Sequence, residues 1–297
     1  MSKELADLAL SAALAGAELV RERARGPVTV AATKSSDVDV VTEADRASEA
    51  LIRAHLAAAR PGDGFLGEEG DDVTSSTGVR WIVDPIDGTV NFLYGLPQYA
   101  VSVAAEVDGV VVAGAVVDVP QGTVYVGNLA DDAHPATVTR DGEPIEVRGP
   151  VPMAQRLFAT GFSYDRRVRV LQAEAVTRLL PHVRDVRRLG SCALDLCLVA
   201  DGRMDAYVEE GVNLWDHAAA GLIARLAGAR TLVTAGVGGL DLLVCAPSHS
   251  FDEVLQAVDK CAFWIVHGAQ SGAEPMGRRT TRDERTRCGG RTPLGVE

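Results

Sequence analysis

Acidic residues stand beside glycine or an aromatic residue in three separate segments of the 297-residue chain. These acids are Glu68 and Glu69, Asp84 and Asp87, and Asp216. Carboxylates next to apolar strands are costly to bury unless something neutralises them. Hard oxygen ligands of this kind suit Mg²⁺, and Mn²⁺ is also possible. The residue types therefore predict a divalent-cation site assembled from distant parts of the chain.

The middle segment carries a second chemical signal. Residues 84–89 read Asp-Pro-Ile-Asp-Gly-Thr, and we expect the proline to end a strand and to leave both aspartates on one tight turn. Gly88 and Thr89 then open a helix whose first N–H groups point toward the acids. A helix N-terminus binds phosphate, and metal ligands beside a phosphate make a phosphoryl-transfer site.

The same residues also have simpler interpretations. Asp-Pro and Asp-Gly are common turn dipeptides, and Asp216 could be only a helix N-cap. Three acidic segments together favour the metal site. No Cys or Ser lies in a phosphate-loop motif, so we expect hydrolysis of a phosphate monoester by metal-activated water without a covalent intermediate.

Two segments resemble the signatures of a known family. Residues 84–92, Asp-Pro-Ile-Asp-Gly-Thr-Val-Asn-Phe, and residues 215–221, Trp-Asp-His-Ala-Ala-Ala-Gly, are similar to those of the inositol monophosphatase family. Residues 67–69 and the pair Lys34 and Asp45 occur at the family's spacing, and the similarity covers about residues 3–265. The resemblance implies an α/β (α+β) fold, the five-layer αβαβα sandwich shared with fructose-1,6-bisphosphatase, and a homodimer.

The resemblance also implies residue roles around two or three Mg²⁺ ions. The first metal would be held by Glu68, Asp84 and the carbonyl of Ile86, and the second by Asp84, Asp87 and Asp216. Glu68, supported by Thr89 and Asp45, would activate the attacking water, and the amides of Gly88 and Thr89 would bind phosphate. The rest of the substrate would be contacted by Asp87, Gly190, Ser191, Cys192, Glu209 and Asp216. Glu210 is expected to be exposed, because Glu209 takes the matching position.

The substrate remains open among three phosphate esters. The Val-Asn-Phe that follows Thr89 favours myo-inositol 1-phosphate, with histidinol phosphate and fructose 1,6-bisphosphate as alternatives. The resemblance further implies inhibition by Li⁺. A regulatory or assembly protein that keeps the fold without catalysis is the non-enzymatic alternative. The complete acid set favours the enzyme, since a non-enzyme would be free to lose an acid.

The surrounding pattern indicates which elements position these residues. Apolar spacing predicts a helix over residues 3–25 and a second over 42–59, with Thr42 as N-cap and Asp45 three residues on. A short strand is expected within 64–70, and further strands at 80–85, 99–107, 110–118 and 123–127, followed by strand–helix alternation from about residue 150. We expect an N-terminal α+β half (1–148) with most metal ligands, a C-terminal α/β half (149–267) and a disordered tail (268–297).

The composition of the chain limits the classes of partner that the protein is expected to bind. The formal net charge of −12 argues against non-specific nucleic-acid binding, and the absence of a long apolar run argues against a membrane partner. A small phosphorylated metabolite fits a site built around cations. No secretory signal is evident, so a cytoplasmic location is the default. The five cysteines are too few and too scattered for a disulfide framework or a zinc site.

Overall fold

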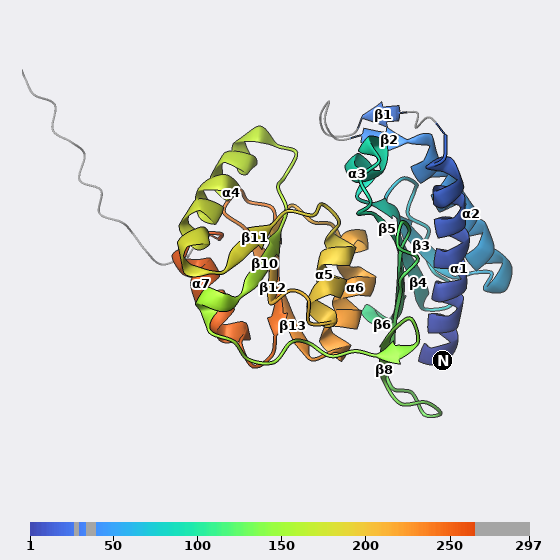
Figure 1. Cartoon of the computed structure of the whole chain (residues 1–297). Helices are drawn as coiled ribbons and strands as arrows, with labels where there is room; N and C mark the ends of the chain where they lie inside the picture. The colour runs from blue at the N-terminus through green and yellow to red at the C-terminus, as the bar shows by residue number, and fades with distance from the viewer. Residues whose placement is uncertain (27–29, 34–39, 265–297) are drawn as a thin grey trace, which may run out of the picture. The chain divides into compact units, whose positions relative to one another are not determined.

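The computed structural model describes residues 1–26, 30–33 and 40–264, which form one compact unit. The predicted tail, Lys34 and Cys288 lie outside these residues. Figure 1 shows five layers, with helices outside and between two sheets. The predicted αβαβα sandwich is therefore confirmed.

The first sheet has seven strands and is covered on its outer face by two helices. These helices are α1 (Ser2–Arg23) and α2 (Glu43–Ala59). The strand order equals the chain order: β3 (Gly64–Gly67), β4 (Val79–Asp87), β5 (Ala100–Val107), β6 (Val110–Asp118), β7 (Val124–Asn128), β8 (Thr137–Arg140) and β9 (Glu143–Pro144). A short pair, β1 (Val30–Thr33) and β2 (Val40–Thr42), and the short helix α3 (Thr89–Tyr94) complete this part.

The second sheet has five strands and lies between two helical layers (Figure 1). In sheet order its strands are β11 (Asp185–Arg187), β10 (Leu157–Thr160), β12 (Ala206–Glu210), β14 (Asp241–Pro247) and β13 (Ala229–Ala235). The central helices are α5 (Cys192–Ala200) and α6 (Leu214–Leu226), and the outer ones are α4 (Arg166–Leu179) and α7 (Phe251–Lys260). The 3₁₀ turns are η1 (Met153–Gln155) and η2 (Leu180–His182).

Small and apolar residues let these layers pack closely. The buried face of α1 is mostly alanine, with Leu5 and Val20 at its two ends, so this helix lies close to the first sheet. Helices α5 and α6 fill the core between the sheets, where Tyr207 of β12 and Ile223 of α6 are fully buried. The central helices therefore share one apolar core with both sheets.

Most of the expected helices and strands are found, with boundaries within one or two residues of the predicted ones. One long strand, however, was not predicted. Strand β13 pairs with β14 over its whole length, at the edge of the second sheet. Both Leu232 and Val233 are at least one-third exposed there, so the strand lacks the apolar–polar alternation that signals a half-buried strand. Across the described residues, no helix combines the length and the apolar character that a bilayer crossing requires.

Candidate functional site

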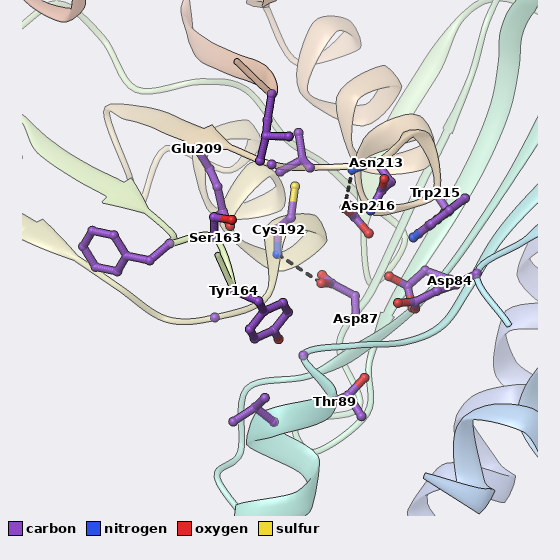
Figure 2. Close-up of a pocket in the computed structure, with 18 of the residues that line it drawn as sticks. Asp84, Asp87, Thr89, Ser163, Tyr164, Cys192, Glu209, Asn213, Trp215 and Asp216 are labelled. Carbon is purple, nitrogen blue, oxygen red and sulfur yellow. Dashed lines mark hydrogen bonds between the residues drawn. The ribbon is translucent and has the colours of Figure 1, made fainter. Parts of the chain in front are cut away.

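A cavity of about 650 Å³ opens where the ends of β4 and β12 meet the first turns of α3, α5 and α6. Ten of the predicted site residues line it: Glu68, Asp84, Ile86, Asp87, Gly88, Thr89, Gly190, Cys192, Glu209 and Asp216. Figure 2 shows Asp84, Asp87 and Asp216 facing the same space. The remaining two, Asp45 and Ser191, are buried behind the lining.

A β-bulge brings Asp84 and Asp87 to one face of the first sheet. The prediction that Pro85 ends the strand and leaves both acids on a tight turn is wrong, because β4 continues through Asp87. Asp84 pairs with Ser102 and Asp87 with Ala100, so three steps along β4 match two along β5. In a regular strand, residues three apart point to opposite faces, and the extra residue corrects this.

Gly88 joins the bulge to α3, and the helix begins where the sequence predicted it. Its φ of +101° lies in the left-handed region, and a Cβ there would come within 2.9 Å of the Gln98 carbonyl oxygen. The position therefore requires glycine. The Phe92 N–H donates to the Gly88 carbonyl (3.0 Å), which closes the first turn of α3. Thr89 then begins the helix at the cavity wall.

A capping box at the start of α2 holds Asp45 behind Thr89. The backbone N–H of Thr42 donates to Asp45 Oδ2 (2.8 Å), and the Thr42 hydroxyl also donates to this oxygen. The Thr89 hydroxyl lies 3.0 Å from Asp45 Oδ1 and 3.0 Å from the Ile86 carbonyl oxygen. Asp45 is fully buried, which raises the pKa of its carboxyl, and the Thr42 hydrogen bonds counter this shift in part.

Helix α2 also positions the loop that carries Glu68. The backbone N–H of Glu69 donates to Glu49 Oε2 of α2 (2.8 Å). A Cβ at Gly67 would come within 2.3 Å of the same carboxylate, so only glycine lets the loop approach α2 this closely. Glu68 reaches the cavity from this loop and is hydrogen-bonded to Asp84. The nearby carboxylate of Glu68 therefore raises the pKa of Asp84.

Asp87 connects the two sheets through the N-terminus of α5. Its carboxylate accepts hydrogen bonds from the Ser191 hydroxyl (2.5 Å) and from the backbone N–H groups of Cys192 (3.2 Å) and Ala193 (2.7 Å). Burial nevertheless raises the pKa of Asp87 to about 6, although these hydrogen bonds lower it. Sequence spacing gave no sign of this role, because the partners are more than 100 residues away.

The acids of the cavity disfavour one another's charge. Burial raises the pKa of Asp84 well above its ordinary value, and the charges of Glu68, Asp87 and Asp216 raise it further. Burial likewise raises the pKa of Asp216, followed by the charges of Glu68 and Asp87. Asp216 is held by a capping box at the start of α6, where the Asn213 N–H donates to its Oδ2 (2.6 Å). The N-cap of α6 is Asn213, so the interpretation of Asp216 as a helix N-cap is wrong; Asp216 is the third residue of the helix and lines the cavity.

This donor set has the chemistry of a hard-cation site. A divalent cation would relieve the mutual repulsion that raises these pKa values. Among the described residues, however, no three His, Cys, Asp or Glu side chains already form a cage that could hold a metal ion. Asp87 and Asp216 are instead hydrogen-bonded to backbone N–H groups. The residues fit Mg²⁺ by type and charge, and binding requires some of them to turn toward it.

On the opposite wall, Glu209 faces the cavity (Figure 2). Its neighbour Glu210 is not among the residues that line the cavity. Burial raises the pKa of Glu209. The prediction that Glu210 is exposed is wrong. Glu210 is only 2% exposed, and its Oε1 accepts the N–H groups of Gly238 (2.7 Å) and Leu240 (3.1 Å). Alternation along β12 sends these two glutamates to opposite faces, and both faces of this central strand are covered.

Asn91 was not predicted as a site residue. Its side-chain amide donates to the carbonyl oxygens of Gln98 (2.7 Å) and Leu189 (2.8 Å). It therefore joins α3 to the loop that leads into Gly190 and Ser191. The sequence signal that could have indicated this link between α3 and the Gly190 loop is an asparagine two residues after Thr89.

Comparison with known proteins gives one consistent result. The chain matches the sequence model of the inositol monophosphatase family over residues 1–261. The inositol-1-monophosphatase SuhB of Mycobacterium tuberculosis is 50% identical over 235 residues, 76% of this chain and 80% of that protein. The solved structure of Mycobacterium tuberculosis SuhB is similar with a TM-score of 0.74 and 42% identity, covering 89% of this chain and 99% of that one. The Nus factor SuhB of Pasteurella multocida is 34% identical over 236 residues, 77% of this chain and 86% of that protein.

Proposed function

The chain belongs to the inositol monophosphatase family, a family of phosphoric monoester hydrolases, and we propose that it hydrolyses myo-inositol 1-phosphate in a Mg²⁺-dependent reaction. The observation that carries this proposal is the convergence of Glu68, Asp84, Asp87 and Asp216 on one cavity beside the first turn of α3. The 50% identity to an inositol-1-monophosphatase supports the choice of substrate.

The four acids and one carbonyl would hold the cations. We assign Glu68, Asp84 and the Ile86 carbonyl to the first metal, and Asp84, Asp87 and Asp216 to the second. Bound Mg²⁺ would act as a Lewis acid toward the phosphate and would lower the pKa of water. The raised pKa values of Asp84 and Asp216 support this assignment, since the cavity favours added positive charge.

The chain's own groups would then orient the reactants. The Thr89 hydroxyl can accept a hydrogen bond from the attacking water while it donates to Asp45 Oδ1 (3.0 Å). Glu68, at the cavity wall, can take the proton of that water. The backbone N–H groups of Gly88 and Thr89 are not needed for hydrogen bonding within α3 and are assigned to the phosphate oxygens. Positioned groups of this kind lower the barrier because their orientation is set before the reaction.

The test is a phosphate-release assay. We expect Mg²⁺-dependent phosphate release from myo-inositol 1-phosphate, and slower release from histidinol phosphate and fructose 1,6-bisphosphate. Activity should vanish with EDTA and return with Mg²⁺, and Li⁺ should inhibit it. Phosphate release that survives exhaustive chelation would exclude the metal-dependent mechanism. Preference for histidinol phosphate would keep the mechanism and change the substrate.

Thr89→Val tests whether this hydroxyl orients the attacking water for Glu68. Valine keeps the shape of threonine and removes the hydroxyl that contacts Asp45, so we expect kcat to fall about 100-fold, because proton transfer to Glu68 depends on the orientation of the water. Thr89→Ser keeps the hydroxyl and is the matched control, with expected activity within a few-fold of wild type. Equal losses in the two variants would show that the methyl group, and not the hydroxyl, matters.

A second candidate function is non-catalytic and comes from the relative named Nus factor SuhB. The net charge of −12 favours a protein partner over direct nucleic-acid contact. Retention of all four cavity acids favours catalysis as the main role. The two roles separate in a complementation experiment with a catalytically dead variant, since only a non-catalytic role survives loss of phosphate release.

A further inference from the structure

The carboxylate of Glu209 lies directly over Gly161, on the neighbouring strand. Strands β10 and β12 are parallel, with Ala159 opposite Tyr207 and Thr160 opposite Val208, so Gly161 is the next residue in line with Glu209. A Cβ built on Gly161 would come within 2.0 Å of Glu209 Cδ and Oε2 and 2.1 Å of Oε1. Any larger residue at 161 would therefore displace this carboxylate.

The backbone of Gly161 gives no other reason for glycine. Gly161 is not among the glycines with positive φ, so an L-residue could adopt its conformation. What excludes a side chain there is the Glu209 carboxylate itself. The absence of a side chain at 161 thus makes the space that Glu209 occupies.

Tyr207 fixes the same carboxylate from its own strand. It lies two residues before Glu209, on the same face of β12, and its hydroxyl donates to Glu209 Oε2 (2.8 Å). The tyrosine is fully buried, and its hydroxyl is also hydrogen-bonded to the thiol of Cys192, which lines the cavity. The Tyr207 hydrogen bond thus fixes Oε2 of a carboxylate that lines the cavity.

We propose that Gly161 and Tyr207 are positioning residues that hold the Glu209 carboxylate for recognition of a substrate hydroxyl group. The proposal rests on the proposed function, because it assumes that Glu209 meets the alcohol part of a phosphate ester. It further predicts which substrates depend on the pair. Phosphate esters whose alcohol part carries hydroxyl groups need the oriented carboxylate, and esters without such groups do not.

Tyr207→Phe is the first test, because phenylalanine keeps the buried ring and removes only the hydroxyl. We expect KM for myo-inositol 1-phosphate to rise about tenfold with kcat nearly unchanged, the usual size for a lost hydrogen bond to a charged group. KM and kcat for phenyl phosphate, whose alcohol part has no other hydroxyl, should stay as in wild type. Equal losses on both substrates would mean a general structural role and would overturn the proposal.

Gly161→Ala, combined with Glu209→Ala, is the second test. Alone, Gly161→Ala should raise KM for myo-inositol 1-phosphate more than about tenfold, since the carboxylate must move. In the Glu209→Ala background, Gly161→Ala should not raise KM further, because the carboxylate that it displaces is absent. Additive effects would overturn the proposal. If wild type releases phosphate from neither substrate, the proposed function fails and this inference fails with it.

Discussion

Asp84→Asn should abolish phosphate release, with kcat lowered about 10⁴-fold, which corresponds to about 5.5 kcal/mol. Asp84 is the acid assigned to both metals, and the charges of Glu68 and Asp87 both act on it. Asparagine keeps its size but removes one negative charge. The measurement is steady-state phosphate release across a range of Mg²⁺ concentrations.

The same variant should fold well without metal. The side-chain oxygen of the new asparagine can still accept the Ile86 N–H, which donates to Asp84 Oδ1 (3.0 Å) in the wild type, and its amide can donate to Glu68. We therefore expect metal-free Asp84→Asn to melt at the wild-type temperature or above, and to gain less stability from Mg²⁺. Near-normal turnover, or a full response to Mg²⁺ in thermal melts, would show that Asp84 is no metal ligand.

Asp87→Asn is the informative contrast. The Asp87 carboxylate accepts hydrogen bonds from Ser191, Cys192 and Ala193, so an amide nitrogen in its place would face donors. This variant should also lose activity, but it should lose metal-free stability through the start of α5. The pair of variants thus separates a ligand whose hydrogen bonds an asparagine can keep from one whose carboxylate also joins the two sheets.

The second large effect is an inverted pH dependence of stability. Asp87 has a pKa of about 6 in the fold, raised from 3.8, so the native state holds a proton that the unfolded state has released between these values. The stability that protonated Asp87 contributes is therefore fully present below about pH 4, and it is lost as pH rises through 6. The loss is about 3 kcal/mol, or a fall in Tm of roughly 5 °C for a chain of this length. The raised pKa values of Asp84 and Asp216 extend the loss to higher pH.

Mg²⁺ should reverse this trend, since a cation favours the ionised acids. Thermal melts of the EDTA-treated protein from about pH 4 to about pH 8, repeated with Mg²⁺, provide the measurement. Asp84→Asn is the control, and its metal-free profile should be flatter than that of wild type. A metal-free Tm that rises steadily with pH would contradict the buried, mutually repelling acids on which the site depends.

The sequence determined the features that depend on neighbours a few residues apart. The capping box formed by Thr42 and Asp45 needs only a three-residue spacing, and it caps α2 as predicted. Gly88 and Thr89 begin a helix because glycine permits the left-handed turn before it. The types of the acids likewise predicted a hard-cation site, since burial of carboxylates requires compensation wherever they lie.

Only the tertiary structure decided which side chains share a space. Asp84 and Asp87 face one way because of a bulge in the pairing of β4 with β5, and such a register is a property of two strands. Glu209 and Glu210 are alike in sequence, yet one faces the cavity and the other is buried behind it. Gly161 lacks a side chain because a carboxylate from β12 fills that space. These contacts join residues that lie far apart in the chain, so packing, and not local preference, sets them.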